Sequence, residues 1–204
     1  MSEIYALSDD FFTPEDVIVK SIHEILDNGI KFVQFRSKKK EKNEKIISEL
    51  IRLCDDYHAY LIINDDALLA RKLGAHGVHI GKDDGSIIKA REILGENKII
   101  GVSCYDDLTL ALNAQQNGAS YAAFGAVFKS PTKKDAKICN HDVLKKAAEI
   151  LKIPTCVIGG INAGNLRQIL KFHPNFVAIV SALYHPRSIT ENLKNLQRII
   201  NEYN

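Results

Sequence analysis

Residues 59–80, AYLIINDDALLARKLGAHGVHI, contain one complete unit of the pattern that decides the fold. The unit begins with the apolar run AYLIIN, passes into a helical pattern over 66–73, and reaches a second apolar run, GVHI, at 77–80. Gly74 follows the helical pattern, and glycine suits the left-handed position that ends many helices. Two parallel strands must be joined by a crossover of this kind, so we predict strand, helix and parallel strand in that order.

The same unit recurs along the whole chain. Apolar runs that predict strands lie at 4–8, 31–35, 59–64, 77–80, 99–103, 121–125, 154–159 and 176–181. Helical patterns lie at 15–28, 41–57, 66–73, 86–94, 107–117, 141–151, 163–172 and 188–202. Alternating units indicate an α/β fold with a parallel sheet, and eight units that close on themselves form a (β/α)8 TIM barrel. We predict a single barrel domain over 1–204; a doubly wound open sheet is the alternative.

Composition excludes several classes of function. The net charge is +2, from 27 basic and 25 acidic residues, which argues against general nucleic-acid binding. None of the four cysteines forms a C-x-x-C pair, so we expect reduced thiols, as in a cytosolic protein. The start of the chain lacks the pattern of a signal peptide, and no apolar run approaches the roughly 20 residues that span a bilayer. We therefore expect a cytoplasmic protein that binds neither nucleic acid nor membrane.

Active sites of (β/α)8 barrels lie at the carboxyl ends of the strands, so the polar residues after each apolar run are the candidates. Gln34, Arg36 and Lys38 are spaced by two and should point the same way on an extended chain. An amide, a guanidinium and an ammonium group together suit a polyanion such as pyrophosphate. The alternative is a solvated basic turn, which we favour for the lysines that follow.

Two pairs of aspartates follow the third and fourth strands. Asp65 and Asp66 come after Asn64, and Asp83 and Asp84 follow the run GVHIGK. Mg²⁺ is commonly held by one or two carboxylates together with substrate phosphate and water. Helix N-capping is the alternative, since Asp is a favoured cap, but a cap needs only one residue of each pair. Spacing alone leaves both interpretations open.

Further candidates lie at the later strand ends. Ser103 either caps the next helix or donates to a phosphate. Gly159 and Gly160 let backbone N–H groups approach a ligand, or they form a tight turn. Loops after strands seven and eight commonly bind phosphate in barrels. We therefore expect two anion sites, and two phosphorylated ligands that meet over one barrel.

Eight segments of the chain resemble the thiamine-phosphate synthase family, in order and in approximate spacing, over residues 4–184. They are YALSDD, VQFRSK, LIINDD, GAHGVHIGKDD, IIGVS, FGAVFKSPTKKDA, VIGGIN and VAIVSAL. The resemblance implies a (β/α)8 barrel and a Mg²⁺-dependent transferase of thiamine biosynthesis. This enzyme joins 4-amino-5-hydroxymethyl-2-methylpyrimidine diphosphate to hydroxyethylthiazole phosphate, giving thiamine phosphate and pyrophosphate. It also implies small phosphorylated substrates as ligands, and a homodimer as the common oligomeric state.

The resemblance also implies roles for individual residues. The catalytic groups, which stabilise the leaving pyrophosphate, would be Arg36, Lys38, Ser103 and Lys133. The other substrate-binding residues would be Gln34, Asn64, Ser130, Thr132, Gly160, Val180 and Ser181, of which the last three hold the thiazole phosphate. The Mg²⁺ ligands would be Asp65 and Asp84.

Departures from the family pattern keep other interpretations open. Lys82 replaces the usual Gln; it would either contact the diphosphate or pair with Asp83 or Asp84 and weaken the cation site. The paralogous thiazole tautomerases carry His at the position of Ala126 and often lose the Q-x-R-x-K block, which this chain keeps. A tautomerase-like paralogue and a non-catalytic thiazole phosphate-binding protein are the two alternatives. We expect His79 to be a packed, hydrogen-bonded core histidine.

Overall fold

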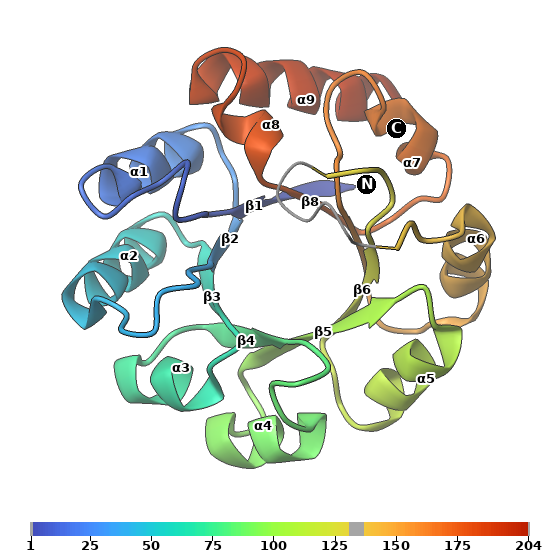
Figure 1. The fold of residues 1–204 in the computed structure, drawn as a ribbon, viewed down its shortest axis with the longest axis horizontal. Coiled ribbons are helices and arrows are strands. Elements are labelled where there is room, and N and C mark those ends of the chain that lie inside the picture. The colour runs from blue at the N-terminus through green and yellow to red at the C-terminus, as the bar shows by residue number, and fades with distance from the viewer. Residues whose placement is uncertain (1, 131–136, 204) are drawn as a thin grey trace.

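The computed structural model describes residues 2–130 and 137–203, and its strands form one closed parallel barrel in chain order (Figure 1). The strands are β1 (Glu3–Leu7), β2 (Phe32–Phe35), β3 (Tyr60–Asn64), β4 (Gly77–Ile80), β5 (Ile99–Tyr105), β6 (Tyr121–Gly125), β7 (Thr155–Ile158) and β8 (Phe176–Ile179). β8 pairs in parallel with β1, which closes the sheet. The predicted (β/α)8 barrel is confirmed, and the open-sheet alternative is wrong.

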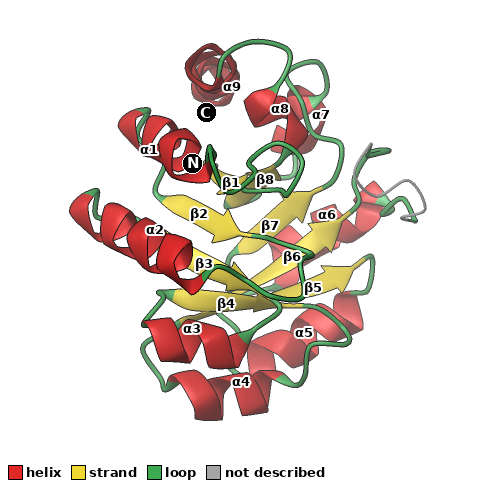
Figure 2. Cartoon of the chain, turned by 60° about the vertical axis from the view of Figure 1, so that its left-hand side comes forward, coloured by secondary structure: helices red, strands yellow, loops and turns green. Residues whose placement is uncertain are grey.

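The helices lie outside the barrel (Figures 1 and 2). Besides a short helical turn after β8, they are α1 (Ile18–Asp27), α2 (Glu44–Asp56), α3 (Ala67–Leu73), α4 (Ile87–Leu94), α5 (Leu108–Gln116), α6 (His141–Ile150), α7 (Leu166–Leu170) and α9 (Ile189–Tyr203). In the part of the chain that the structure describes, no helix combines the length and the apolar character needed to cross a membrane.

The unit at 59–80 forms as its sequence predicts. The Asp66 side chain caps α3 by accepting the N–H of Leu69 at 2.8 Å, and Gly74 ends the helix with a left-handed φ of 79°. β4 then pairs in parallel with β3, with Ile62 opposite Gly77. Local capping signals and the strand pattern therefore agree with the tertiary fold.

The predicted strand at 176–181 is too long, because β8 ends at Ile179 and a single helical turn, α8 (Ser181–Tyr184), follows it. The β1–β8 pairing ends with Ile179 opposite Ala6, although β1 itself continues to Leu7. The chain satisfies its backbone groups by turning: the N–H of Leu183 donates to the carbonyl oxygen of Val180 at 3.0 Å.

Two apolar layers hold the fold together. The larger layer lies between the barrel and the helices, and the smaller one fills the barrel interior around Tyr5, Ile62, Tyr121, Cys156 and Ala178. The Tyr5 and Tyr121 rings pack edge to face, with centroids 5.9 Å apart. These aromatic rings fill the barrel beneath the carboxyl ends of the strands, so they form a floor for whatever binds above.

Gly101 on β5 leaves the space that one of these rings occupies. It lies opposite Tyr121 in the β5–β6 register. A Cβ atom at this position would lie 2.0 Å from Cζ of the Tyr121 ring, far inside van der Waals contact. The residue that forms the barrel floor therefore requires glycine on the neighbouring strand.

We expect Gly101→Ala to lower the free energy of unfolding by about 3 kcal/mol or more, because the new methyl group must displace a packed ring. Gly74→Ala is the matched control: nothing lies within 4 Å of the added Cβ, but φ is +79°, so the expected loss is about 1 kcal/mol. Urea unfolding followed by circular dichroism measures both. Equal losses in the two variants would contradict the proposed steric cause.

Candidate active site

A cavity of about 950 Å³ opens at the carboxyl ends of the strands, and all eight strands or the loops after them contribute to its wall. Every predicted site residue that the structure describes lines this cavity: Gln34, Arg36, Lys38, Asn64, Asp65, Asp84, Ser103, Ser130, Gly160, Val180 and Ser181. Thr132 and Lys133 lie outside the described residues. Residues that are far apart in the chain therefore meet in one space.

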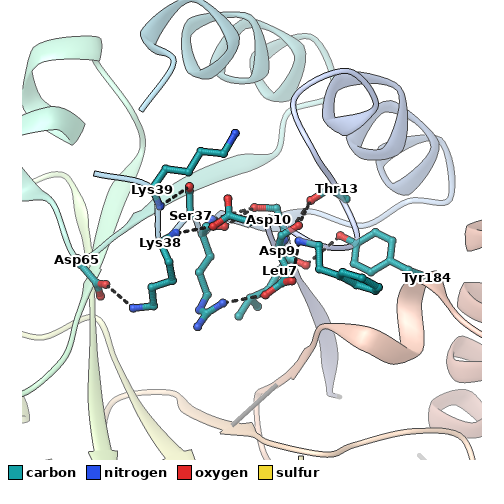
Figure 3. Close-up of polar contacts among 12 residues, drawn as sticks. Leu7, Asp9, Asp10, Thr13, Ser37, Lys38, Lys39, Asp65 and Tyr184 are labelled. Atoms are coloured by element: carbon teal, nitrogen blue, oxygen red, sulfur yellow. Dashed lines mark hydrogen bonds and ion pairs between the residues drawn. The ribbon is translucent and has the colours of Figure 1, made fainter. Parts of the chain in front are cut away.

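Arg36 and Lys38 form a basic wall, and each is paired with a carboxylate. The Arg36 Nη1 atom lies 3.0 Å from Asp9 Oδ2, and both side chains are largely buried. The backbone N–H of Lys38 donates to Asp10 Oδ2 at 2.7 Å, while its Nζ atom lies 3.4 Å from Asp65 Oδ2 (Figure 3). The sequence prediction does not include Asp9, although this residue closely follows a strand. The strand-end rule that selects the other residues would find it.

The aspartates after β3 divide their roles. Asp66 is the N-cap of α3, so capping is the right interpretation for that residue. Asp65 has a left-handed φ of 67° and donates its N–H to the carbonyl oxygen of His79 at 2.8 Å. Positive φ is uncommon outside glycine and persists where the surroundings impose it, often at functional sites. This backbone turn directs the Asp65 carboxylate toward the cavity.

Neither aspartate after β4 caps a helix. Ser86 caps α4 by accepting the N–H of Lys89, so the capping alternative is wrong for this pair. Asp84 instead accepts the N–H of Gly81 at 2.7 Å, which fixes the shape of the β4–α4 loop. Its carboxylate consequently lies beside the cavity rather than over the helix end.

Asp65 and Asp84 lie close enough to affect each other. Burial raises the pKa of the Asp84 carboxyl above its usual value, and the neighbouring Asp65 carboxyl raises it further, whereas the Gly81 N–H and the charge of Lys38 act in the opposite direction. A divalent cation between the two carboxylates would relieve this repulsion. Oxygen donors from one or two carboxylates are what Mg²⁺ takes when phosphate and water complete its shell. Among the described residues no group of three or more His, Cys, Asp or Glu is placed to hold a metal alone.

A chain of hydrogen bonds crosses the cavity floor through five strands. Gln34 Nε2 donates to the Tyr5 hydroxyl at 2.9 Å, which lies 3.0 Å from the Tyr121 hydroxyl. His79 lies 2.9 Å from that hydroxyl through Nδ1 and 2.9 Å from the Ser103 Oγ atom through Nε2. Complete burial raises the pKa of both tyrosines above their usual value, so they stay neutral.

Two expectations change at this floor. His79 is hydrogen-bonded as predicted, but it lines the cavity and is not a core residue, because its strand places it on the inner face of the barrel. Ser103 is not a helix cap, since Asp107 caps α5 by accepting the N–H of Thr109 at 2.8 Å. Asn64 is almost fully buried and adds a neutral polar group to the same wall. The floor thus offers several hydrogen-bonding groups to a ligand in the cavity.

The wall after β7 and β8 has no charged side chain among its described lining residues and is formed by Gly159, Gly160, Val180 and Ser181 with nearby apolar groups. A Cβ atom on Gly160 would lie 2.2 Å from the carbonyl oxygen of Lys129. Glycine is therefore required by the close packing of two loops, which is a different reason from the ligand approach that we predicted. Ser181 begins the short helix α8, and loops after strands seven and eight with a short extra helix are a frequent phosphate site in barrels.

The cavity rim contains residues that the strand-end analysis missed. Tyr105 and Asp106 lie at the end of β5 and line the cavity together with Lys82 and Lys137. Lys137 Nζ lies 2.7 Å from Asp106 Oδ2, and its side chain is 82% exposed. The apolar run predicted a strand over 99–103, but β5 continues to Tyr105. Tyr105 and Asp106 therefore lie beyond the strand end that the sequence analysis used.

Comparison with known proteins agrees with this geometry. The Thiamine monophosphate synthase family model matches residues 4–183. The thiamine-phosphate synthase of Nitrosococcus oceani is 41% identical, over 91% of this chain and 87% of the relative, and that of Halorhodospira halophila is 38% identical over 90% and 87%. The solved thiamine phosphate pyrophosphorylase of Pyrococcus furiosus superposes with a TM-score of 0.86 and 33% identity, over 98% and 96% of the two chains. With its barrel, its cavity and these relatives, the chain belongs to the thiamine monophosphate synthase family.

Proposed function

We propose that this protein is a thiamine-phosphate synthase. It would condense 4-amino-5-hydroxymethyl-2-methylpyrimidine diphosphate with hydroxyethylthiazole phosphate and release thiamine phosphate and pyrophosphate. The observation that carries the proposal is the meeting, in one cavity, of a basic wall with two facing carboxylates and an uncharged glycine-containing wall. These walls suit a diphosphate with its cation and a second, singly phosphorylated ligand.

The reaction needs charge stabilisation more than a nucleophile from the protein. The bond between the pyrimidine methylene carbon and the diphosphate oxygen breaks, and its electron pair leaves with pyrophosphate. The thiazole nitrogen then donates its lone pair to the carbon. Arg36 and Lys38 would stabilise the departing charge, and charges positioned in this way often make the greatest contribution to catalysis. Asp9 holds the Arg36 guanidinium at 3.0 Å, so this group is oriented before substrate binds.

We assign the cation to Asp65 and Asp84. Mg²⁺, when bound, would neutralise charge on the diphosphate and its leaving group. The Lys38–Asp65 pair is partly exposed and 3.4 Å long, and pairs of this kind are weak. Lys38 would therefore exchange the carboxylate for a phosphate oxygen, which would leave Asp65 to hold the cation.

We assign the two rings to the remaining walls. Gln34 and Asn64 offer neutral donors and acceptors for the aminopyrimidine, and the Ser103 hydroxyl would donate to the diphosphate. The thiazole phosphate would lie against Gly160 and Ser181, near Val180 and Ser130. Thr132 and Lys133 belong to this proposal through the family resemblance alone.

The tautomerase alternative finds no support in this cavity. Ala126 lines the wall at the position where the tautomerase paralogues carry His. Its methyl group cannot accept or donate a proton, and the basic wall has no task in an isomerisation of a singly phosphorylated thiazole. Synthase chemistry needs the basic wall and requires no proton-transferring side chain at position 126.

Purified protein with both substrates and Mg²⁺ should form thiamine phosphate and pyrophosphate in equal amounts. Chromatography of the thiamine phosphate and an enzymatic pyrophosphate assay measure the two products. EDTA should stop the reaction, and added Mg²⁺ should restore it. Binding of the thiazole phosphate without any product would instead identify a non-catalytic binding protein.

Arg36→Ala and Asp65→Ala should each lower kcat/KM by at least about a hundredfold, because each removes a charge that acts on the leaving group or its cation. Arg71→Ala and Asp56→Ala make the same changes on exposed helix positions outside the cavity and should leave turnover unchanged. Circular dichroism should show the same fold in all four variants. Near-normal activity in either cavity variant would count against its assigned role.

Asp84→Asn should stabilise the cation-free protein near pH 7, because the pKa of Asp84 is raised in the fold and its charge is therefore unfavourable there. The gain should disappear below about pH 4, where this carboxyl is protonated in the unfolded chain as well. Millimolar Mg²⁺ should then raise the Tm of the wild type more than that of the variant. Thermal unfolding from pH 3 to 8 tests both statements; an equal Mg²⁺ effect on the two proteins would remove Asp84 from the cation site.

A further inference from the structure

Lys82 occupies a fixed place on the cavity wall that no role assigned above explains. It follows β4 and lines the cavity. The loop around it is anchored at two consecutive backbone groups: Gly81 N–H donates to Asp84 Oδ2 at 2.7 Å, and Lys82 N–H donates to the Tyr105 hydroxyl at 3.3 Å. The position of the Lys82 backbone is therefore held by these hydrogen bonds, and Lys82 lines the cavity from an anchored loop.

Lys82 also differs from the other cations around it. In the described part of the wall the lysines and arginines are Arg36, Lys38, Lys82 and Lys137. Three of them lie within 3.4 Å of a carboxylate oxygen of an aspartate. The Lys82 ammonium has no ion pair with any residue in 2–130 or 137–203. An anion that binds the Lys82 ammonium would therefore not have to displace a carboxylate of any residue that the structure describes.

The two aspartates beside Lys82 do not use its charge. Asp84 turns its Oδ2 atom to the Gly81 N–H and faces Asp65, and the lysine whose charge acts on it is Lys38. Asp83 forms no ion pair with Lys82 in the structure. The sequence left two possibilities open for Lys82: contact with the diphosphate, or pairing with Asp83 or Asp84 that weakens the cation site. No contact in the structure supports the second.

We propose that the Lys82 ammonium binds the diphosphate group of the pyrimidine substrate and the pyrophosphate that leaves. This inference rests on the proposed function. β2, β3 and β4 are neighbours in the barrel, so Lys38, Asp65 and Lys82 follow one another along the rim. Two lysines thus flank the carboxylate that we assign to the cation, and a compact ammonium suits phosphate oxygens. Together they would hold the polyanion from both sides.

Lys82→Gln is the variant that tests the proposal, because it removes the charge and keeps a polar side chain. Titration calorimetry with inorganic pyrophosphate and Mg²⁺ should show about tenfold weaker binding than in the wild type, the effect of one opposite charge in a partly exposed site. The loss should shrink at high salt, and Lys82→Arg should recover most of the affinity. In turnover, KM for the pyrimidine diphosphate should rise by about the same factor, while KM for the thiazole phosphate stays unchanged.

Lys89→Gln is the matched control, since it removes the same charge from the exposed side of the next helix, outside the cavity. It should bind pyrophosphate as the wild type does. Equal losses in the two variants, or none in Lys82→Gln, would overturn the proposal. It would also be overturned if Lys82→Gln lowered the Mg²⁺ concentration needed for half-maximal activity, because Lys82 would then act against the cation.

Failure of this inference is separable from failure of the proposed function. If the wild type makes thiamine phosphate and Lys82→Gln binds pyrophosphate equally well, only the role of Lys82 is wrong. If the wild type makes no product but binds pyrophosphate through Lys82, the synthase assignment is wrong and the anion site stands. If the wild type does not bind pyrophosphate at all, both are wrong.

Discussion

β1 and β8 pair in parallel from Glu3 opposite Phe176 to Ala6 opposite Ile179, and this pairing closes the sheet. Closure gives every strand two neighbours, so the carboxyl ends of all strands surround one cavity. The loops after β2, β3 and β4 then place the basic wall beside the carboxylates of Asp65 and Asp84. The loops after β7 and β8 form the glycine-containing wall of the same cavity. An open sheet would place these loops along a line, and the basic wall and the glycine-containing wall would not face each other across one cavity.

The electrostatics of the cavity depend on this arrangement. Asp9 holds the largely buried Arg36 guanidinium at 3.0 Å and orients it without ligand, whereas the Lys38–Asp65 and Lys137–Asp106 pairs are exposed to solvent. In the floor below, burial keeps the Tyr5 and Tyr121 hydroxyls neutral, and the two are hydrogen-bonded to each other. Charge is therefore concentrated at the upper walls, where a diphosphate and its cation would lie. The aminopyrimidine ring would lie against the floor.

Local sequence predicted most elements because the local and tertiary preferences agree. Asp66 and Gly74 mark the two ends of α3, and the apolar run at 77–80 forms β4 at those bounds. Agreement fails at α8, where the apolar run continues past Ile179 but the β1–β8 pairing ends at that residue and the chain turns into a helix. Hydrophobicity predicts burial there, and only strand pairing decides between strand and helix.

The sequence by itself determined the alternating strand and helix units and the polar strand ends that line the cavity, whereas the pairing of β8 with β1 decided for a closed barrel over an open sheet. Tertiary structure alone decided which partner each polar group has. Asp65 faces Asp84 because the loops after β3 and β4 meet, whereas its neighbour Asp66 caps a helix. His79 lies between Tyr121 and Ser103 on the cavity floor, through contacts that join residues 42 and 24 positions apart in the chain. Spacing along a chain predicts the direction of a side chain, but a hydrogen bond or an ion pair depends on distances between segments that only the closed barrel brings together.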